Sequence, residues 1–349
     1  DRVKAANEPN STALYTEVAF ARVSGDGGGE HRRVVVGRLI TLLLAAGVAV
    51  AVSAALLRIF GGGGSRWTFA ALVFTPYALG GAGLLVVLGL ATRRWVISAG
   101  AVLAAVVLGV GVLPRAVADA QPDATGPVLT VGSANLYFGR VDAHAVVDLV
   151  RPRDVDVLSL QELTPQAITA LDTAGLGELL PYRVFRPEPR AAGTGLASRY
   201  PLRERASTRP SYHWQPAALV DLPGGLDVEV VAVHTVAPVG MVQPFQWRAE
   251  ITDLPQPLAG RITRVLAGDF NATLDHRPLR ALLGTGYRDA ADAMGRGLRA
   301  TWPTDMSIAP IAAIDHVLVA QICLVRSFDT IPLPNGDHRA VVAEIELPG

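Results

Sequence analysis

Side chains able to bind a metal ion or to transfer protons lie at the ends of short apolar runs in the second half of the chain. These side chains are Asn135, Gln161, Glu162, His234, Asp269, Asn271, Asp315, His316, Asp337 and His338. Each run has the length and composition of a β-strand. Since α/β sheets build their sites at the ends of neighbouring strands, we expect these residues to form one site, except His316, to which we assign a structural role beside Asp315.

The residue types in this set indicate a hard divalent cation. Carboxylate and amide oxygens suit Mg²⁺ or Mn²⁺. The set contains no thiolate ligand, because the only cysteine is Cys323 in a predicted strand. Mg²⁺ usually takes one or two carboxylates and leaves a position for a substrate phosphate. Histidines beside carboxylates can stabilise or protonate a phosphoryl oxygen, and an aspartate can activate water. Together these parts predict a metal-assisted phosphoester hydrolase.

Residues 128–349 resemble the endonuclease/exonuclease/phosphatase superfamily, which has the deoxyribonuclease I-like fold. The resemblance rests on residues that occur in the family's order: Asn135, the Gln161–Glu162 pair, His234, Gly268-Asp269-Phe270-Asn271, Asp315 and Gly336-Asp337-His338-Arg339. It implies an α/β (α+β) four-layer sandwich, in which two mixed β-sheets pack face to face and helices flank them.

The resemblance also implies which residues hold the metal. Glu162 is then the main ligand of Mg²⁺ or Mn²⁺, Asn135 assists at the metal or the substrate, and Asp337 binds the metal directly or through water. Some members of the family carry an aspartate two positions after the first asparagine, where this chain has Tyr137. Whether the site holds one or two metal ions therefore stays open.

The same resemblance implies the catalytic roles. Asp269 orients or deprotonates the attacking water, and Asn271 holds that water or the phosphate. His338 contacts the scissile phosphate and is kept in one tautomer by Asp315. His234 matches a position where several members place a histidine that binds the phosphate or the leaving group. Which of these groups is the general base stays open.

The elements that position these residues follow from the apolar pattern. We expect strands at 128–134, 155–160, 217–222, 228–233, 263–267, 314–320 and 340–346. We expect helices at 142–151, 165–173, 246–254 and 276–283. This mixture predicts a domain built around a largely buried sheet. Thr301-Trp302-Pro303 also resembles the family, which implies that Trp302 forms a substrate-binding wall of the site.

The first third of the chain has a different composition. Three uncharged segments, 39–57, 67–92 and 95–114, each match the ~20 apolar residues that a helix needs to cross a bilayer. None of them shows a polar face, which disfavours three buried helices of a soluble domain. We therefore predict three transmembrane α-helices within residues 35–114. Charged side chains would mark an ion pathway, and their absence from the three segments disfavours a transporter.

Arginines predict the orientation of these helices. Five lie on the side of the N-terminus and three on the other side: Arg32, Arg33, Arg38, Arg93 and Arg94 against Arg58, Arg66 and Arg115. The positive-inside rule then places the N-terminus in the cytoplasm and the C-terminal domain outside. Residues 1–34 are mostly polar and glycine-rich, so we expect a disordered cytoplasmic tail. Residues 115–127 read as a linker to the catalytic domain at 128–349.

The net charge bears on the substrate. The chain has 31 basic and 31 acidic residues, and residues 126–349 hold 20 arginines and 24 acidic residues, a net charge of −4. Nucleic-acid binding usually relies on a basic surface, so this charge disfavours a nuclease without excluding it. A phospholipid head group, a nucleotide or nucleic acid, and a diester or a monoester all stay open. Partners other than the bilayer are not indicated, and an inactive binding or sensor module remains the alternative to an enzyme.

Overall fold

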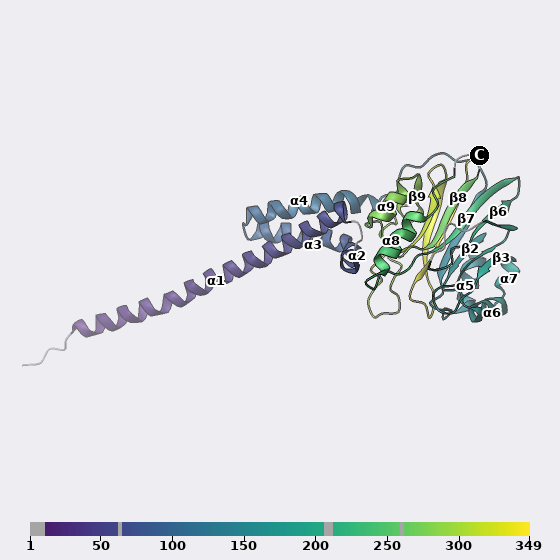
Figure 1. Ribbon diagram of the computed structural model, residues 1–349. Helices are drawn as coiled ribbons and strands as arrows, with labels where there is room; N and C mark the ends of the chain where they lie inside the picture. Colours follow the sequence, from purple (N-terminus) through teal and green to yellow (C-terminus); the bar gives the residue numbers. More distant parts are fainter. Residues whose placement is uncertain (1–10, 62–64, 206–211, 259–261) are drawn as a thin grey trace, which may run out of the picture.

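The computed structural model describes residues 11–61, 65–205, 212–258 and 262–349, with side chains from residue 31 onward. A bundle of helices comes first, and a β-sandwich lies at one end of it (Figure 1). The helices of this bundle are α1 (Ser11–Phe60), α2 (Arg66–Val73), α3 (Thr75–Ala91) and α4 (Trp95–Val112), and the 3₁₀ helix η1 (Leu113–Ala116) leads out of it.

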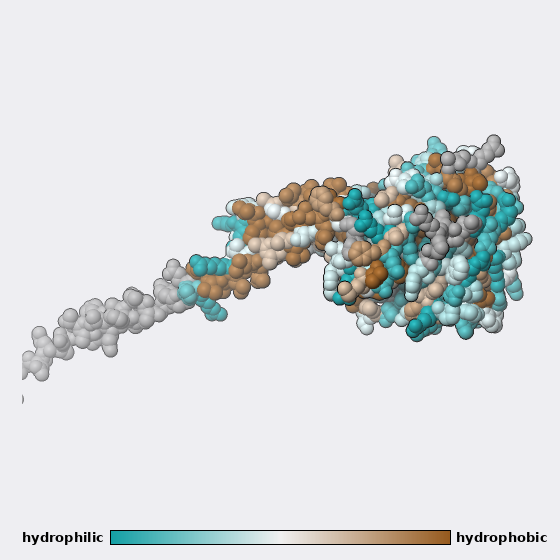
Figure 2. Space-filling view, in the orientation of Figure 1, coloured by the Kyte–Doolittle hydropathy of each residue, from teal (hydrophilic) through white to brown (hydrophobic). Residues whose placement is uncertain are grey.

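Small residues let the long helices approach one another. Ala51 of α1, Ala82 of α3 and Ala104 of α4 form a buried cluster, and such residues allow close backbone contact in membrane bundles. Large side chains point outward instead, and those that are more than half exposed include Leu39, Leu42, Leu43, Val50, Leu84, Val87, Leu103, Val106 and Val110. The visible side of the bundle is therefore apolar, beside a mainly polar sandwich (Figure 2).

Two of the described helices, His31–Phe60 and Trp95–Ala116, are long and apolar enough to cross a membrane. The segment expected as one helix at 67–92 is instead broken into α2 and α3, which meet at 62°. Pro76 explains the break, because proline cannot donate a backbone hydrogen bond and clashes with the preceding turn. Thr75 Oγ1 instead donates to the carbonyl of Leu72 at 2.7 Å. A third span results only if this bent pair counts as one.

The expected disordered tail at 1–34 differs from the structure over most of its length. α1 already begins at Ser11, and residues 1–10 lie outside the described part. Once the apolar part of a helix has formed, each added residue costs less than starting a new helix, which explains how α1 extends through a polar segment.

Each of the two sheets contains six strands. The first has the order β11-β12-β1-β2-β4-β3, and the second has the order β5-β6-β7-β8-β10-β9. The strands are β1 (Val128–Asn135), β2 (Val157–Gln161), β3 (Tyr182–Arg186), β4 (Thr194–Ser198), β5 (Leu202–Arg205), β6 (Ala217–Leu222), β7 (Leu226–His234), β8 (Thr263–Asp269), β9 (Tyr287–Asp289), β10 (Asp315–Ala320), β11 (Leu324–Pro332) and β12 (Arg339–Glu346). Both sheets are mixed, because β1–β2 and β7–β8 are parallel and the other pairs are antiparallel.

Helices cover the outer faces of the two sheets. They are α5 (Ala143–Val150), η2 (Arg151–Arg153), α6 (Pro165–Thr173), α7 (Leu176–Leu179), α8 (Gln243–Asp253), α9 (Arg277–Leu283) and α10 (Ala290–Ala293). The main core lies between the sheets, and two further clusters lie under α5–α7 and under α8–α9. The predicted sandwich of two mixed sheets flanked by helices is therefore confirmed.

The bundle is attached to the sandwich by a buried ion cluster. Asp275, just before α9, accepts from Arg58 of α1 at 2.8 Å and from both terminal nitrogens of Arg115 at 2.7 and 2.8 Å. Arg280 donates to the carbonyl of Arg58 at 2.6 Å. Asp275 is fully buried, so these bonds are shielded from water, and breaking one partner of such a cluster is costly.

The linker expected at 115–127 lies against the sandwich. Ala118 forms a β-bridge with Met294. Further along, Gln121 exchanges two hydrogen bonds with the backbone of Val325, at 2.7 and 3.0 Å. The linker therefore contacts β11 of the first sheet, while the ion cluster fixes the bundle beside α9, which covers the second sheet.

Candidate active site

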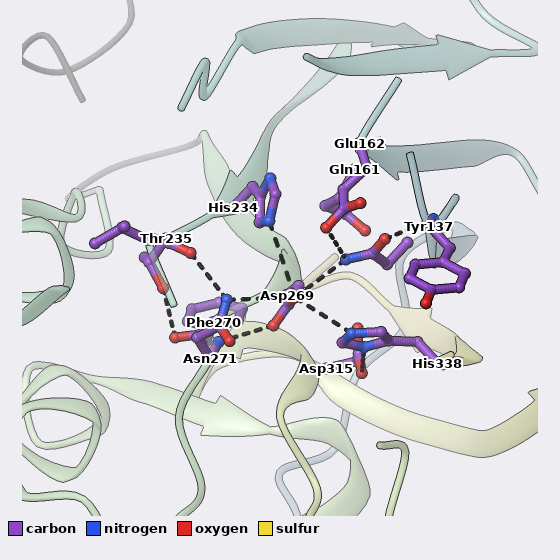
Figure 3. A network of polar contacts seen from close by, with 12 residues as sticks. Tyr137, Gln161, Glu162, His234, Thr235, Asp269, Phe270, Asn271, Asp315 and His338 are labelled. Carbon is purple, nitrogen blue, oxygen red and sulfur yellow. Dashed lines mark hydrogen bonds and ion pairs between the residues drawn. The ribbon is translucent and has the colours of Figure 1, made fainter. Parts of the chain in front are cut away.

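Strand ends from both sheets bring the predicted residues together (Figure 3). Within the second sheet, Asp269 at the end of β8 is paired with His234 on one side and with Asp315 on the other. From the first sheet, Asn135 ends β1, and its amide donates to Asp269 Oδ2 at 3.2 Å. The two sheets therefore meet at Asp269, which lies at the centre of the site.

Asp269 is buried among groups that control its protonation. Burial raises its pKa to about 7, although the positive charge of His338 opposes the change. His338 Nε2 lies 3.8 Å from Asp269 Oδ2, and His234 Nε2 lies 4.0 Å from the same oxygen. The backbone amide of Asn271 donates to Asp269 Oδ1 at 2.8 Å. A carboxylate with a pKa near neutrality can accept a proton from water, as a general base requires.

His338 is held by Asp315, the partner that the family resemblance implies for it. Its Nδ1 donates to Asp315 Oδ2 at 2.9 Å, and both side chains are buried. Burial lowers the pKa of His338, but the carboxylates of Asp315 and Asp269 outweigh burial and raise that pKa to about 10. The imidazole is therefore a cation whose Nε2 faces the centre of the site, where it can bind a phosphoryl oxygen.

Glu162 stands where the chain turns away from β2. Its Oε2 accepts from the backbone amide of Phe138 at 2.7 Å, and its Oε1 accepts from Asn135 at 3.4 Å. Burial raises the pKa of Glu162, while the bond from Phe138 lowers it. The side chain of the preceding residue, Gln161, accepts a hydrogen bond from Ser133 of the neighbouring strand and donates one to Ser159. Glu162 therefore faces the site, and Gln161 has a structural role.

The oxygen atoms around Glu162 and Asp337 fit a hard cation. Among the described residues, Oδ1 of Asp337 is buried and has no hydrogen-bond partner, and such an orphaned oxygen needs a cation or another donor. Asp337 is close enough to Glu162 to raise its pKa. Ligand atoms of Asp269, Asp315 and His338 also lie within 4.8 Å of one another. His338 already donates to Asp315, so we favour the oxygen set of Glu162 and Asp337 for the metal.

Asn271 has both a turn role and a place in the site. Its φ is 46°, and its side-chain amide donates to the carbonyl of Thr235 at 2.9 Å. This bond and the contact with Asp269 hold Asn271 in the wall of a cavity.

The site opens into a cavity of about 360 Å³. Its polar floor contains Glu162, His234, Asp269, Asn271, Asp337 and His338. Trp302 forms part of the wall, and its ring centroid lies 6.5 Å from that of His338. Apart from Gln161, the residues predicted for the site therefore lie at or next to this cavity, with Asn135 and Asp315 just behind it.

Two histidines for which the sequence indicates no role in the site, His213 and His276, are buried. His213 lines the cavity and stacks on His234, with ring centroids 4.1 Å apart. Burial lowers the pKa of His213 to about 4 and that of His234 well below its ordinary value, so both rings are neutral. His276 packs against α2 instead. The neighbours of His213 in the chain, Tyr212 and Trp214, are exposed, so no local pattern in the sequence marks His213 as a buried residue.

Comparison with known proteins identifies the relatives of this sandwich. Residues 132–338 match the profile of the endonuclease/exonuclease/phosphatase family. No curated protein matches the chain. Similar solved structures include an AP endonuclease from Archaeoglobus fulgidus, at 17% identity and a TM-score of 0.49, over 62% of this chain and 98% of that one. A sphingomyelinase C from Streptomyces griseocarneus matches at 15% identity and 0.42, over 62% and 99% of the two chains. A protein of the same family from Beutenbergia cavernae matches at 17% and 0.46, over 64% and 72%.

Proposed function

Because the chain belongs to the endonuclease/exonuclease/phosphatase family, we propose that it is a metal-dependent phosphodiesterase anchored in a membrane, with its catalytic domain outside the cytoplasm. Members of this family are generally hydrolases of phosphoester bonds. The observation that carries the proposal is the convergence of Glu162, Asp269, Asp337 and His338 on the floor of one cavity. Carboxylate oxygens that can hold a metal ion, a general base with a pKa near neutrality and a cationic imidazole are together the parts of a phosphoester hydrolase.

The proposed reaction uses these residues in distinct roles. A divalent cation held by Glu162 and Asp337, with Asn135 beside them, would supply Lewis acidity toward a phosphate oxygen. Asp269 accepts the proton of the attacking water, and Asn271 positions that water or the phosphate. The water oxygen bonds to phosphorus, the bond to the leaving oxygen breaks, and that oxygen leaves with a proton.

Histidines then stabilise charge on the reacting phosphate. His338, positively charged and held by Asp315, binds a phosphoryl oxygen as negative charge develops. His234 is neutral and lies on the other side of Asp269, where it can donate to the leaving oxygen. Trp302 forms the wall against which the substrate rests.

The outer surface of the bundle supports membrane anchoring. Along residues 39–57 of α1, and along α3 and α4, the exposed residues are nearly all apolar, whereas soluble monomers rarely expose an apolar patch above a few hundred Å². Trp67 and Trp95, which are 71% and 66% exposed, lie at opposite ends of the bundle. Tryptophan favours such interface positions. The excess of arginine near the N-terminal side supports a catalytic domain outside the cytoplasm.

The test is hydrolysis of bis-p-nitrophenyl phosphate and p-nitrophenyl phosphate by the full chain in detergent, with Mg²⁺ or Mn²⁺ and with EDTA. We expect turnover of the diester that depends on the cation. Glu162→Gln should lower it at least about 100-fold, because even outer-shell partners of a metal cost 10–100-fold. Glu178→Gln, an exposed glutamate on α7, is the matched control and should keep the wild-type rate.

Other outcomes lead to other functions. Turnover of the monoester alone would make the chain a phosphomonoesterase of the same fold. A diester rate that survives in both Glu162→Gln and His338→Ala would contradict the proposed mechanism. Absence of turnover of either ester in the folded chain would leave an inactive binding or sensor module.

A further inference from the structure

Part of the wall of the cavity comes from the helical bundle. Phe69 and Val73 of α2 line the same cavity as Glu162, Asp269 and His338. Phe69 is fixed there, because its ring stacks on His276 at 4.2 Å and packs edge-on against Trp247 at 5.1 Å. The proposed catalytic floor is thus bounded by a helix that belongs to the apolar module of the chain.

The position of α2 places the cavity close to the bilayer surface. α1 and α4 both reach the sandwich at their C-terminal ends, where Arg58 and Arg115 bind Asp275. α2 lies at that same end and is inclined by 62° to α3 (Figure 1). It carries Trp67, which is 71% exposed and has the guanidinium of Arg66 4.7 Å from its ring centroid. An exposed tryptophan beside an arginine is typical of the interface between hydrocarbon and head groups.

An apolar rim lies at another side of the cavity. We use this name for Val239, Met241, Val242 and Phe245, which are 74%, 84%, 61% and 59% exposed. Val239 itself lines the cavity together with Phe69. Residues 235–247 contain no charged residue. Exposed apolar side chains at the mouth of a cavity mark a surface that binds lipid or protein, and here the surface is next to the bundle.

The charges around the cavity disfavour nucleic acid. Among the described residues that line it, none is arginine or lysine. A nucleic acid carries a phosphate at every nucleotide, and neutralising those neighbouring phosphates requires several cations. A phospholipid carries one phosphodiester and two apolar chains. The cavity has one polar floor for the phosphodiester and two apolar walls for the chains, formed by α2 and by the apolar rim.

We infer that the substrate is a phospholipid of the same bilayer, which enters between α2 and the apolar rim and places its phosphodiester over Glu162 and Asp269. This inference rests on the proposed phosphodiesterase activity. Hydrolysis adds one water to phosphorus and breaks one P–O ester bond, whose oxygen leaves as an alcohol. The lipid therefore yields one phosphomonoester and one alcohol, and no oxidant or further reactant is required.

The full chain, reconstituted into vesicles with Mg²⁺, tests the inference. The vesicles contain equal parts of phosphatidylcholine, phosphatidylethanolamine, phosphatidylglycerol and phosphatidylinositol, and mass spectrometry measures the products. Bis-p-nitrophenyl phosphate and single-stranded DNA are assayed in parallel as water-soluble diesters. We expect turnover of at least one lipid and none of the DNA.

A rim variant separates lipid access from chemistry. In Met241→Gln/Phe245→Gln, the ratio of lipid to soluble-diester turnover should fall at least about tenfold, because both side chains lose favourable transfer into the apolar layer. Ile322→Gln is the matched control: Ile322 is 53% exposed, but it follows the end of β10 that is remote from Asp315. This control should leave the ratio unchanged.

Three results are informative in different ways. Turnover of the soluble diester or of DNA without turnover of lipid would overturn the inference and leave the phosphodiesterase in place. An equal loss of lipid and soluble-diester turnover in the rim variant would also overturn it. If none of the diesters is hydrolysed, the proposed function fails first and the inference fails with it.

Discussion

Two adjacent residues of β10 take part in two different carboxylate–imidazole pairs. Asp315 accepts from His338 at 2.9 Å, and His316 donates to Asp289 at 2.7 Å. Neighbouring side chains on a strand point to opposite faces of the sheet. Asp315 therefore faces the site, whereas His316 faces the outer layer, where it also bonds to the carbonyl of Ala272. The same chemical pair thus lies in the proposed active site on one face and in the outer layer on the other.

This arrangement provides a matched test of the role of Asp315. Asp315→Asn removes the charge that keeps His338 cationic and oriented, so we expect kcat for the diester to fall about 100-fold, as for other outer-shell partners. KM should change little, because Asn can still accept the hydrogen bond. Steady-state kinetics measures both values.

Asp289→Asn is the control for this prediction. It weakens an equally buried pair away from the cavity, so it should lower the melting temperature without lowering kcat of the folded fraction. An equal effect of the two substitutions on kcat would show that Asp315 acts only through stability.

Backbone conformation at the site is a second feature of the residue scale. Tyr137, Phe138, Glu162 and Asn271 all have φ between 46° and 55°, in the left-handed region. Non-glycine residues in this region carry strain that surrounding bonds must offset. Here the offset includes the bonds from Phe138 to Glu162 and from Asn271 to Asp269. Of these four, only Asn271 is of a type that favours this region. The sequence does not indicate the conformation of Glu162, so only the structure shows how its side chain is turned into the site.

At the scale of elements, the contact of α2 with α9 depends on a neutral histidine. The backbone amide of Thr273 donates to His276 Nδ1 at 2.9 Å, and His276 Nε2 donates to the carbonyl of Phe69 at 3.2 Å. Burial lowers the pKa of His276 to about 4, against 6.5 in the absence of the fold. Protonation would remove the acceptor for Thr273 and add charge near Arg280.

Acid should therefore weaken this contact. Because the folded-state pKa lies below the unfolded one, stability is complete above pH 6.5 and is lost as the pH falls toward 4. At about pH 5 the loss is about 2 kcal/mol, which lowers the melting temperature by about 4–8 °C. His276→Asn keeps an acceptor and does not titrate, so its melting temperature should fall less between neutral pH and about pH 5.

Thermal unfolding of the full chain in detergent measures the difference. His144→Asn replaces an exposed histidine and should follow the wild type. If His276→Asn and the wild type lose the same stability in acid, other groups carry the pH dependence and His276 does not.

The sequence predicted the elements that are apolar enough to stand out. The seven expected strands are present as β1, β2, β6, β7, β8, β10 and β12, each largely buried. β3 and β5 lie at sheet edges and are partly exposed, so no apolar run marks them. β4 is buried, but its sequence Thr-Gly-Leu-Ala-Ser consists mostly of small residues. The hydrophobic periodicity and the composition of the sequence therefore predict central strands better than edge strands.

The polar floor of the site could be predicted, but its apolar wall could not. Glu162, Asp269 and His338 could be predicted because each lies at the end of a predicted strand, where a polar side chain indicates a site. Phe69 belongs to an apolar segment in which nothing distinguishes it from its neighbours. Its contact with His276 joins residues more than 200 positions apart, and only the packing of the bundle on α8 and α9 shows it.

At the scale of the whole molecule, the ion cluster limits how the sandwich can sit on a membrane. Arg58 and Arg115 lie near the C-terminal ends of two apolar helices, and both bind Asp275. If the bundle spans a membrane as we propose, the sandwich must lie directly against the bilayer surface, on the side of these helix ends. The turn between α3 and α4, with Arg93 and Arg94, lies at the other end of the bundle. Each face of the membrane therefore has a distinct exposed site for labelling.

The single cysteine makes the orientation measurable. Cys323 is buried, and burial raises the pKa of its thiol to about 11, so the native chain should react poorly with maleimides. Thr169→Cys adds an exposed thiol on α6 of the catalytic domain, and Thr92→Cys adds one at the turn between α3 and α4. In intact spheroplasts a membrane-impermeant maleimide should label Thr169→Cys, while Thr92→Cys should be labelled only after permeabilisation. The reverse pattern would place the catalytic domain in the cytoplasm, where its cavity would face the inner leaflet, and the arginine count would then have given the wrong orientation.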